Sequence, residues 1–162
     1  MFPVEHIMVD IETLDVAVTA KILSIGACTI VPTDAGRHEF YRELYPHQPS
    51  RTESQSTLDW WKQQANMPHG TLDLASALQQ FSQWIASLRT TPIIWCKGLD
   101  FDVAILNHAF RQCAIQIPWK YNHVRDCRTL EWIFEDKIDK SIENTNSHNA
   151  LSDAKYQRER LS

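Results

Sequence analysis

The order of hydrophobic and polar residues predicts three β-strands at the start of the chain. The apolar run at residues 7–9 is typical of a buried strand. A second apolar run rich in β-branched residues covers residues 21–31 and ends at Pro32, and residues 39–45 alternate before Pro46. Because consecutive strands this close in sequence usually pair with each other, we expect an antiparallel meander of three strands.

Two helices are expected between residues 56 and 89. Ser56 is expected to cap a short helix that runs through Trp60 and Trp61. Adjacent helical residues do not share a face, so one tryptophan should be core and the other should at most border a cleft. A second helix should bury a stripe of apolar residues at helical spacing: Leu74, Leu78, Phe81, Ile85 and Leu88.

The second half of the chain adds a strand and further helices. Residues 92–96 form another buried apolar run, and residues 101–110 read as an amphipathic helix that follows it. Asp126 is expected to cap a later helix, and the last helix should carry Asp153. No linker or repeat divides the sequence, so we expect one α/β domain over residues 1–162 with a sizeable core.

Two carboxylates, Asp10 and Glu12, follow the first strand with one residue between them. Alternate side chains of a strand share a face, so these two would lie about 7 Å apart. Unpaired carboxylates at the end of a core strand repel each other and cost desolvation energy, and a divalent cation is the simplest neutralising partner. On this pair alone, a surface turn in which Asp10 caps the next element fits equally well.

Further acids occur at the ends of later elements. Asp102 follows the strand at residues 92–96, and His148 stands five residues before Asp153. Asp100 competes with Asp102 for the functional position. We prefer Asp102, because Phe101 precedes it and a helix continues after it, and we interpret Asp100 as an N-cap.

The order of these residues resembles the three motifs of the DnaQ-like 3′–5′ exonuclease superfamily, also called DEDDh: Asp10 and Glu12, then Phe101 and Asp102, then His148 and Asp153. The resemblance implies an RNase H-like mixed sheet, with an antiparallel three-strand meander plus parallel strands, flanked by helices. Residues 57–63 and 125–130 make it similar to the phage and bacterial branch of exonuclease-VIII-like and exoribonuclease-like proteins. Lys97 departs from the pattern, because many relatives have Asn there.

The resemblance implies a metal-dependent 3′–5′ exonuclease that hydrolyses single-stranded or 3′-overhanging RNA or DNA and releases nucleoside 5′-monophosphates. Two Mg²⁺ or Mn²⁺ ions would stabilise the attacking and leaving oxygens, and such hard cations prefer oxygen ligands. Asp10 would bridge both ions, Glu12 and Asp153 would complete one shell, and Asp102 would help hold the other. His148 is the expected general base, because its ordinary pKa of about 6.5 suits proton transfer near neutral pH.

Contacts to the nucleic acid 3′ end are also implied. By resemblance, Leu14 would wedge against the terminal base, and Thr13 would offer its backbone or hydroxyl to the 3′ end. Basic residues that flank the later motifs could meet phosphates or could equally be solvated surface charges: Lys97, Arg111, Lys120, Arg125 and Arg128.

Charge and cysteine content narrow the partners, metals and cell compartments that fit this sequence. The net charge of −4 argues against a strongly basic nucleic-acid-binding surface, but bound metals would reverse the sign at the acids. The four cysteines form no C-x-x-C pair, which disfavours zinc and fits reduced thiols in the cytoplasm. No signal segment or membrane-length apolar run is present, so no membrane partner is expected. Relatives are often dimers, so a homodimer is one expected assembly.

Two other functions stay open. One is a non-catalytic nucleic-acid-binding or assembly module with the same fold, which loss of a motif residue would favour, and no motif residue is lost here. The other is a short-oligonucleotide hydrolase, which the compact chain without an additional nucleic-acid-binding domain would suit.

Overall fold

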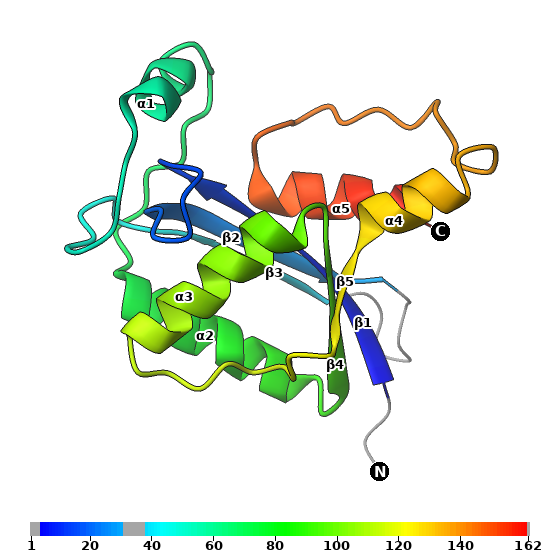
Figure 1. The fold of residues 1–162 in the computed structure, drawn as a ribbon, viewed down its shortest axis with the longest axis horizontal. Helices are drawn as coiled ribbons and strands as arrows, with labels where there is room; N and C mark the ends of the chain where they lie inside the picture. Colours follow the sequence, from blue (N-terminus) through cyan, green and yellow to red (C-terminus); the bar gives the residue numbers. More distant parts are fainter. Residues whose placement is uncertain (1–3, 31–37, 162) are drawn as a thin grey trace.

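A five-stranded mixed sheet lies at the centre of the computed structural model, which describes residues 4–30 and 38–161 (Figure 1). The strand order is β3-β2-β1-β4-β5. The first three strands pair antiparallel, whereas β4 pairs parallel with β1 and β5 parallel with β4. The strands are β1 (Val4–Thr13), β2 (Ile22–Thr29), β3 (Glu39–Glu43), β4 (Thr91–Cys96) and β5 (Val124–Asp126). The predicted RNase H-like arrangement of a meander plus parallel strands is therefore confirmed.

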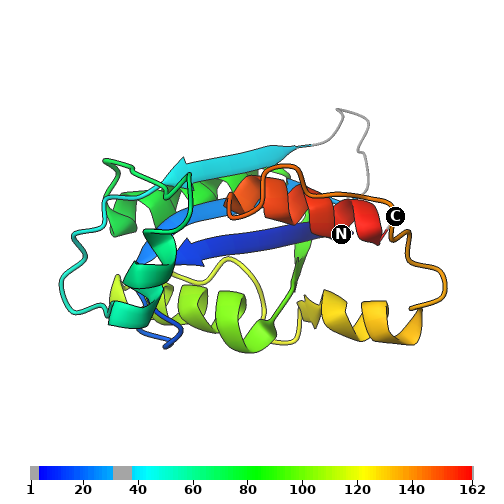
Figure 2. The ribbon, with the colours of Figure 1, turned by 90° about the horizontal axis from the view of Figure 1, so that it is seen from above.

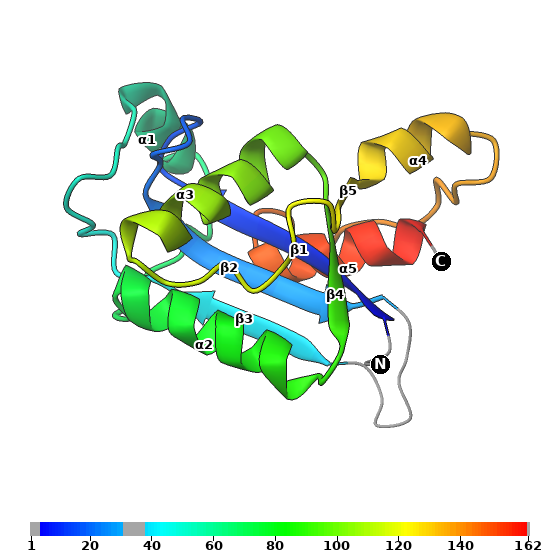
Figure 3. The ribbon, with the colours of Figure 1, turned by 60° about the horizontal axis from the view of Figure 1, so that its bottom comes forward.

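Helices cover both faces of this sheet. They are α1 (Gln55–Trp61), α2 (Leu74–Ser87), the π-helical segment η1 (Leu99–Val103), α3 (Ala104–Gln112), α4 (Cys127–Ile133) and α5 (Ala150–Arg160). Figure 3 shows α2 and α3 in front of one face, and Figure 2 shows α5 packed along the other. Among the described helices, none combines the length and the apolar character needed to cross a membrane.

The alternation of side chains along β1 assigns its acids to the α5 face. The odd-numbered apolar residues from 7 to 11 are buried in the main core with residues of α2 and α3. Met8, on the opposite face, packs in a separate cluster with Ala154 of α5. Asp10 and Glu12 continue the series of Met8, so both carboxylates face α5 from the central strand, as the spacing predicted.

A glycine lets α5 lie directly on the sheet. Gly26 of β2 pairs with Asp10 of β1. A Cβ atom at Gly26 would lie 2.1 Å from Leu151 N and 2.2 Å from the carbonyl carbon of Ala150. The backbone of β2 and the first turn of α5 are thus in direct contact beside Asp10, and only glycine fits there.

Two predicted helix caps are wrong. Helix α1 begins at Gln55, and its N-cap is Ser54, whose hydroxyl accepts a hydrogen bond from Thr57 N. Ser54 has the extended backbone that an N-cap needs, whereas Ser56 already lies inside the first turn. Asp100 lies within η1 rather than before it, and its exposed carboxylate pairs with Arg128 at 3.1 Å.

The other predicted elements are found with small differences in their ends. Asp126 caps α4 as predicted, because its carboxylate accepts from the backbone N–H of Arg128 at 2.9 Å. The second strand stops at Thr29, and the predicted end at Pro32 lies outside the described residues. Strand β5 was not predicted, because three residues carry too little periodicity to show a strand.

Candidate active site

The four predicted acids and His148 line one pocket of about 360 Å³. Asp10 and Glu12 come from β1, Asp102 from η1, and Asp153 from the first turn of α5, just after His148. These elements meet because β4, parallel to β1, leads into η1 at the same end of the sheet at which α5 starts. The structure therefore brings together all six residues of the three sequence motifs, because Phe101 lines the same pocket.

A side-chain hydrogen bond from α5 holds Asp10. Gln157 Nε2, from the next turn of α5 after Asp153, donates to Asp10 Oδ1 at 2.8 Å. Burial raises the pKa of Asp10 well above its ordinary value, and the charges of Asp102 and Glu12 raise it further. Glu12 behaves similarly, because burial and the neighbouring Asp153 raise its pKa to about 8. Both carboxylates would ionise more readily beside a cation.

Asp102 connects η1 to the central strand. Its side chain is 3% exposed, and Oδ1 accepts a hydrogen bond from Ile11 N at 3.2 Å. Burial raises the pKa of Asp102 to about 7, although its backbone hydrogen bonds partly oppose that shift. A π-helical segment is an uncommon feature that often occurs at functional sites, and here it turns a buried carboxylate towards β1.

Asp153 and His148 are organised by the segment that precedes α5. Asn144 Nδ2 donates to Asp153 Oδ1, and His148 N donates to Asp153 Oδ2 at 2.9 Å. His148 has a left-handed backbone with φ of 65°, and its ring packs edge-on against Trp60 with centroids 4.7 Å apart. Ligand atoms of Glu12, His148 and Asp153 all lie within 4.8 Å of one another.

These carboxylates fit a divalent cation. Within residues 4–30 and 38–161, none of the four acids forms an ion pair with lysine or arginine. Lys97 lines the same pocket, but its ammonium group pairs with Glu131 of α4 at 3.1 Å. Asp102 is buried and the other three acids are half-buried, and together their oxygens form a donor set that suits Mg²⁺ or Mn²⁺.

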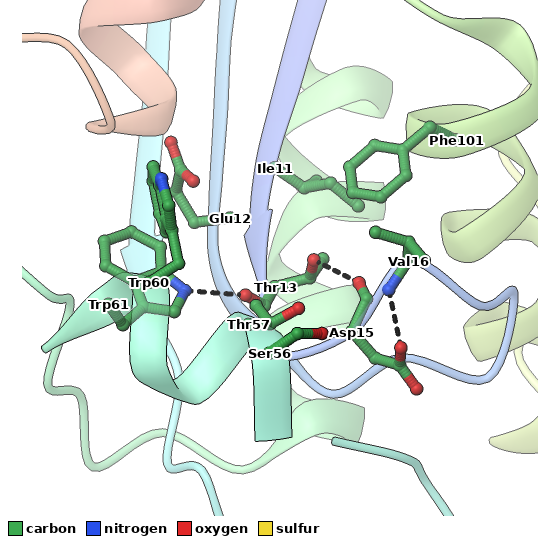
Figure 4. Close-up of a pocket in the computed structure, with 10 residues that line it drawn as sticks. All are labelled: Ile11, Glu12, Thr13, Asp15, Val16, Ser56, Thr57, Trp60, Trp61 and Phe101. Carbon is green, nitrogen blue, oxygen red and sulfur yellow. Dashed lines mark hydrogen bonds between the residues drawn. The ribbon is translucent and has the colours of Figure 1, made fainter. Parts of the chain in front are cut away.

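An apolar pocket of about 300 Å³ adjoins the acids and shares Glu12 with the acidic pocket. Figure 4 shows Trp60 and Phe101 on opposite sides of it. Trp61 is 2% exposed and donates from Nε1 to the Thr13 carbonyl at 2.8 Å, whereas Trp60 is 38% exposed. The prediction that one tryptophan is core and the other borders the cleft is confirmed.

The two residues predicted to contact the 3′ end differ in placement. Thr13 lines the apolar pocket, with its hydroxyl bonded to the Asp15 carbonyl at 2.7 Å. Leu14 is 2% exposed and packs with Leu23 and Trp61. Leu14 follows the end of β1, and in this structure its side chain is buried in this small apolar cluster, so its wedge role stays a prediction. Ile11 lines the pocket instead.

Sequence reasoning missed three residues of the acidic pocket, which are Asn144, Tyr156 and Gln157. Gln157 stands four residues after Asp153, and this helical spacing puts both side chains on one face of α5, so it could have been found. Asn144 also lines the pocket, but it lies in an irregular segment whose path no local pattern fixes.

Comparison with solved structures supports the fold. The chain is similar to a product-bound exonuclease I (TM-score 0.71, 10% identity, 98% of this chain and 42% of that chain). It is also similar to cell-death related nuclease 4, CRN-4, with a TM-score of 0.65 and 13% identity over 97% of this chain and 62% of that chain. The third structure is Pop2p of S. pombe in its Mg²⁺- and Mn²⁺-bound form, with a TM-score of 0.59 and 15% identity over 99% of this chain and 81% of that chain. The chain thus spans less than two thirds of the length of the first two.

A search of curated proteins finds no match. A family model does match almost the whole chain. It describes the 3′-5′ exoribonuclease Rv2179c-like domain and covers residues 5–162. The four acids and His148 all fall inside the match. The chain therefore belongs to the Rv2179c-like family of 3′-5′ exoribonuclease domains.

Proposed function

We propose that this protein is a metal-dependent 3′–5′ exonuclease that removes nucleoside 5′-monophosphates from the 3′ end of single-stranded or 3′-overhanging RNA or DNA. The observation that carries this proposal is the meeting of four carboxylates and His148 in one pocket, with an apolar pocket beside them. Membership of an exoribonuclease domain family supports the reaction class.

The carboxylates of Asp10, Glu12, Asp102 and Asp153 would hold the metal, with two Mg²⁺ or Mn²⁺ ions as the proposed number. When bound, such ions supply the positive charge that stabilises the attacking and leaving oxygens of phosphodiester hydrolysis. The raised pKa values of Asp10, Glu12 and Asp102 support this assignment, because no lysine or arginine in the described part of the chain pairs with these carboxylates. The Mg²⁺- and Mn²⁺-bound Pop2p is a fold neighbour consistent with it.

His148 would act as the general base that takes a proton from the attacking water. Trp60 packs against the imidazole, and the His148 N–H is bonded to Asp153, so both the ring and the backbone are positioned. A positioned general base contributes about 10²- to 10⁴-fold to the rate. Gln157 would fix the orientation of Asp10.

The apolar pocket would receive the 3′-terminal base. Trp60 and Phe101 face each other across it, and aromatic side chains bind unpaired bases of any sequence by stacking. A base in a duplex is already stacked and paired, so this pocket favours single strands. Lys97, at the acidic pocket, would meet a substrate phosphate without neutralising the acids, because Glu131 holds it to one side.

The test is degradation of 3′- and 5′-labelled single-stranded RNA and DNA with Mg²⁺ or Mn²⁺. We expect stepwise 3′ trimming that Asp10→Asn abolishes and His148→Ala reduces at least about 100-fold. Asp136→Asn and His69→Ala are matched controls, because both residues are exposed and lie outside the pocket, and they should trim like wild type.

Direct Mn²⁺ binding, measured by calorimetry, separates the alternatives. Metal binding without cleavage of any substrate would refute the proposal and favour the non-catalytic module. Cleavage of dinucleotides but of no longer strand would favour the short-oligonucleotide hydrolase. Loss of trimming in the Asp136→Asn control as well would show that the assay follows general damage rather than the site.

A further inference from the structure

The side chain of Tyr41, on β3, lies on the same face of the sheet as the acids of the central strand. Tyr41 pairs with Gly26 of β2, and Gly26 pairs with Asp10 of β1. Directly paired residues of antiparallel strands project their side chains to one face, so Tyr41 and Asp10 both face α5. Because Gly26 lets the first turn of α5 lie directly on the sheet, that turn is within reach of the Tyr41 phenol.

A hydrogen bond links Tyr41 to the N-cap residue of α5. Asn149 Nδ2 donates to the hydroxyl oxygen of Tyr41 at 3.1 Å, and Asn149 Oδ1 accepts from Ser152 N at 3.0 Å. The oxygen of this half-buried amide therefore caps the helix, while its nitrogen is fastened to β3. Because its two partners belong to different elements, both ends of the Asn149 side chain are fixed.

The hydroxyl of Tyr41 is itself oriented by Glu43. Tyr41 Oη donates to Glu43 Oε1 at 2.9 Å, and Glu43 Oε2 accepts from His69 N at 3.0 Å. Burial and the hydrogen bond to Glu43 raise the pKa of Tyr41, so the phenol keeps its proton near neutral pH. Because that proton points to Glu43, a lone pair of the hydroxyl oxygen is left to accept from Asn149.

The residue before Asn149 is His148, whose backbone is left-handed with φ of 65°. A residue with a side chain adopts this conformation at an energetic cost and keeps it only where its surroundings determine it. On one side, the His148 N–H is bonded to Asp153 Oδ2 at 2.9 Å. On the other side, the peptide bond joins His148 to Asn149, which Tyr41 holds. The His148 backbone is thus fixed from both α5 and β3.

We propose that Tyr41 is a positioning residue for His148, because its hydroxyl holds the Asn149 amide and thereby the backbone that aims the imidazole at the acids. This inference rests on the proposed function, in which His148 is the general base. Tyr41 does not line the acidic pocket or the apolar pocket beside it. It therefore acts through Asn149 and not by contact with the substrate.

A double-mutant cycle in the trimming assay tests the link. Tyr41→Phe removes only the hydroxyl, and Asn149→Ser removes the amide that reaches it but keeps a good N-cap. Each variant should lower kcat about tenfold, which is less than the loss in His148→Ala because the imidazole is still present. The double variant should lose no more than either single variant, because both changes break the same bond. Tyr121→Phe, at a position that is 92% exposed, is the matched control and should trim like wild type.

An NMR measurement without metal or substrate separates positioning from a general loss of stability. The His148 ring lies edge-on to Trp60 with centroids 4.7 Å apart, so the indole shifts the signals of the imidazole C–H protons. His148→Ala identifies these signals among those of the seven histidines. In Tyr41→Phe and in Asn149→Ser they should move towards the positions of a solvent-exposed histidine, whereas Tyr121→Phe should leave them in place.

Losses that multiply to about 100-fold in the double variant would overturn the proposal. His148 signals that stay in place in both single variants would also overturn it, as would a kcat of Tyr41→Phe within about twofold of wild type. The NMR measurement needs no cleavage, so the two proposals can fail separately. If wild type does not trim while the His148 signals move as expected, the nuclease proposal fails and the link from Tyr41 to His148 stands.

Discussion

Replacing Gly26 with alanine tests whether the contact between β2 and α5 sets the geometry of the site. The new Cβ would lie 2.1 Å from Leu151 N, against 3.4 Å for ordinary contact. Relief requires α5 to move outward by about 1.3 Å, because both contacting partners are backbone and cannot rotate away. His148 and Asp153, which precede and begin this helix, would move with it.

The expected losses differ in size for stability and activity. Overpacking of this kind costs about 1–3 kcal/mol, which lowers Tm by roughly 2–12 °C in a domain of this size. A displacement of about 1 Å at a catalytic group costs about 10²-fold in rate. We therefore expect Gly26→Ala to remain folded at 25 °C, to lose about 100-fold in kcat, and to bind Mn²⁺ more weakly. Thermal unfolding, trimming kinetics and calorimetry measure the three quantities.

Gly70→Ala provides a matched control. Its Cβ would lie 2.0 Å from the Glu43 carbonyl oxygen, so the clash is as severe, but the atoms that it meets belong to Glu43 and Leu44 at the end of β3 and not to α5. This variant should lose a similar amount of stability while keeping most of its activity. Our reasoning is refuted if folded Gly26→Ala trims within about twofold of wild type, or if Gly70→Ala loses as much activity as Gly26→Ala.

Three further predictions concern the tryptophan pair and the acids. Trp61→Ala should lower the free energy of unfolding by about 3–5 kcal/mol in denaturant titrations. Trp60→Ala should leave the free energy of unfolding nearly unchanged and raise KM for single strands. Equal losses of stability in the two variants would contradict the assignment of Trp61 to the core and Trp60 to the pocket. Burial raises the pKa of Glu12 to about 8 and that of Asp102 to about 7, so ionisation of these two carboxylates opposes folding. In the presence of EDTA, Tm should therefore fall as the pH rises from 4.5 towards 8. Added Mg²⁺ should raise Tm, and the increase should be largest at the alkaline end of this range. A Tm that does not change with pH would exclude this coupling. Asp10→Asn removes one of the carboxylates that repel one another, so without metal at pH 8 this variant should have a higher Tm than wild type, although it cannot trim. A lower Tm would contradict the repulsion between Asp10 and the neighbouring carboxylates.

The acids of the site could be predicted from the sequence, whereas the backbone that surrounds them could not. Asp10 and Glu12 could be placed because the period of a strand fixes which side chains share a face. Asp102 could be preferred over Asp100 because of the residues around it, yet the cap role of Asp100 was wrong, since the Gly98 turn opens directly into a π-helical segment. Local patterns report on periodicity and not on such irregular backbone.

Long-range contacts were the part that sequence reasoning could not supply. The burial of Leu14 depends on Trp61, 47 positions away, whose indole reaches back to the Thr13 carbonyl. A cavity of about 460 Å³ likewise forms between residues 82–92 and residues 116–123, two segments that are distant in sequence. Neither arrangement leaves a mark in any short window of residues, because each is decided by tertiary packing.

The bond between Gln157 and Asp10 joins residues 147 positions apart, which has a consequence for the order in which the protein is made. During synthesis, β1 emerges first and the helix that carries Gln157 and Asp153 emerges last among the elements of the site. Until that helix docks on β1 and β2, the acids of the central strand have neither their orienting amide nor their fourth carboxylate. The site should therefore stay inactive during synthesis, with the RNA of the ribosome close by, until α5 has emerged and docked on the sheet.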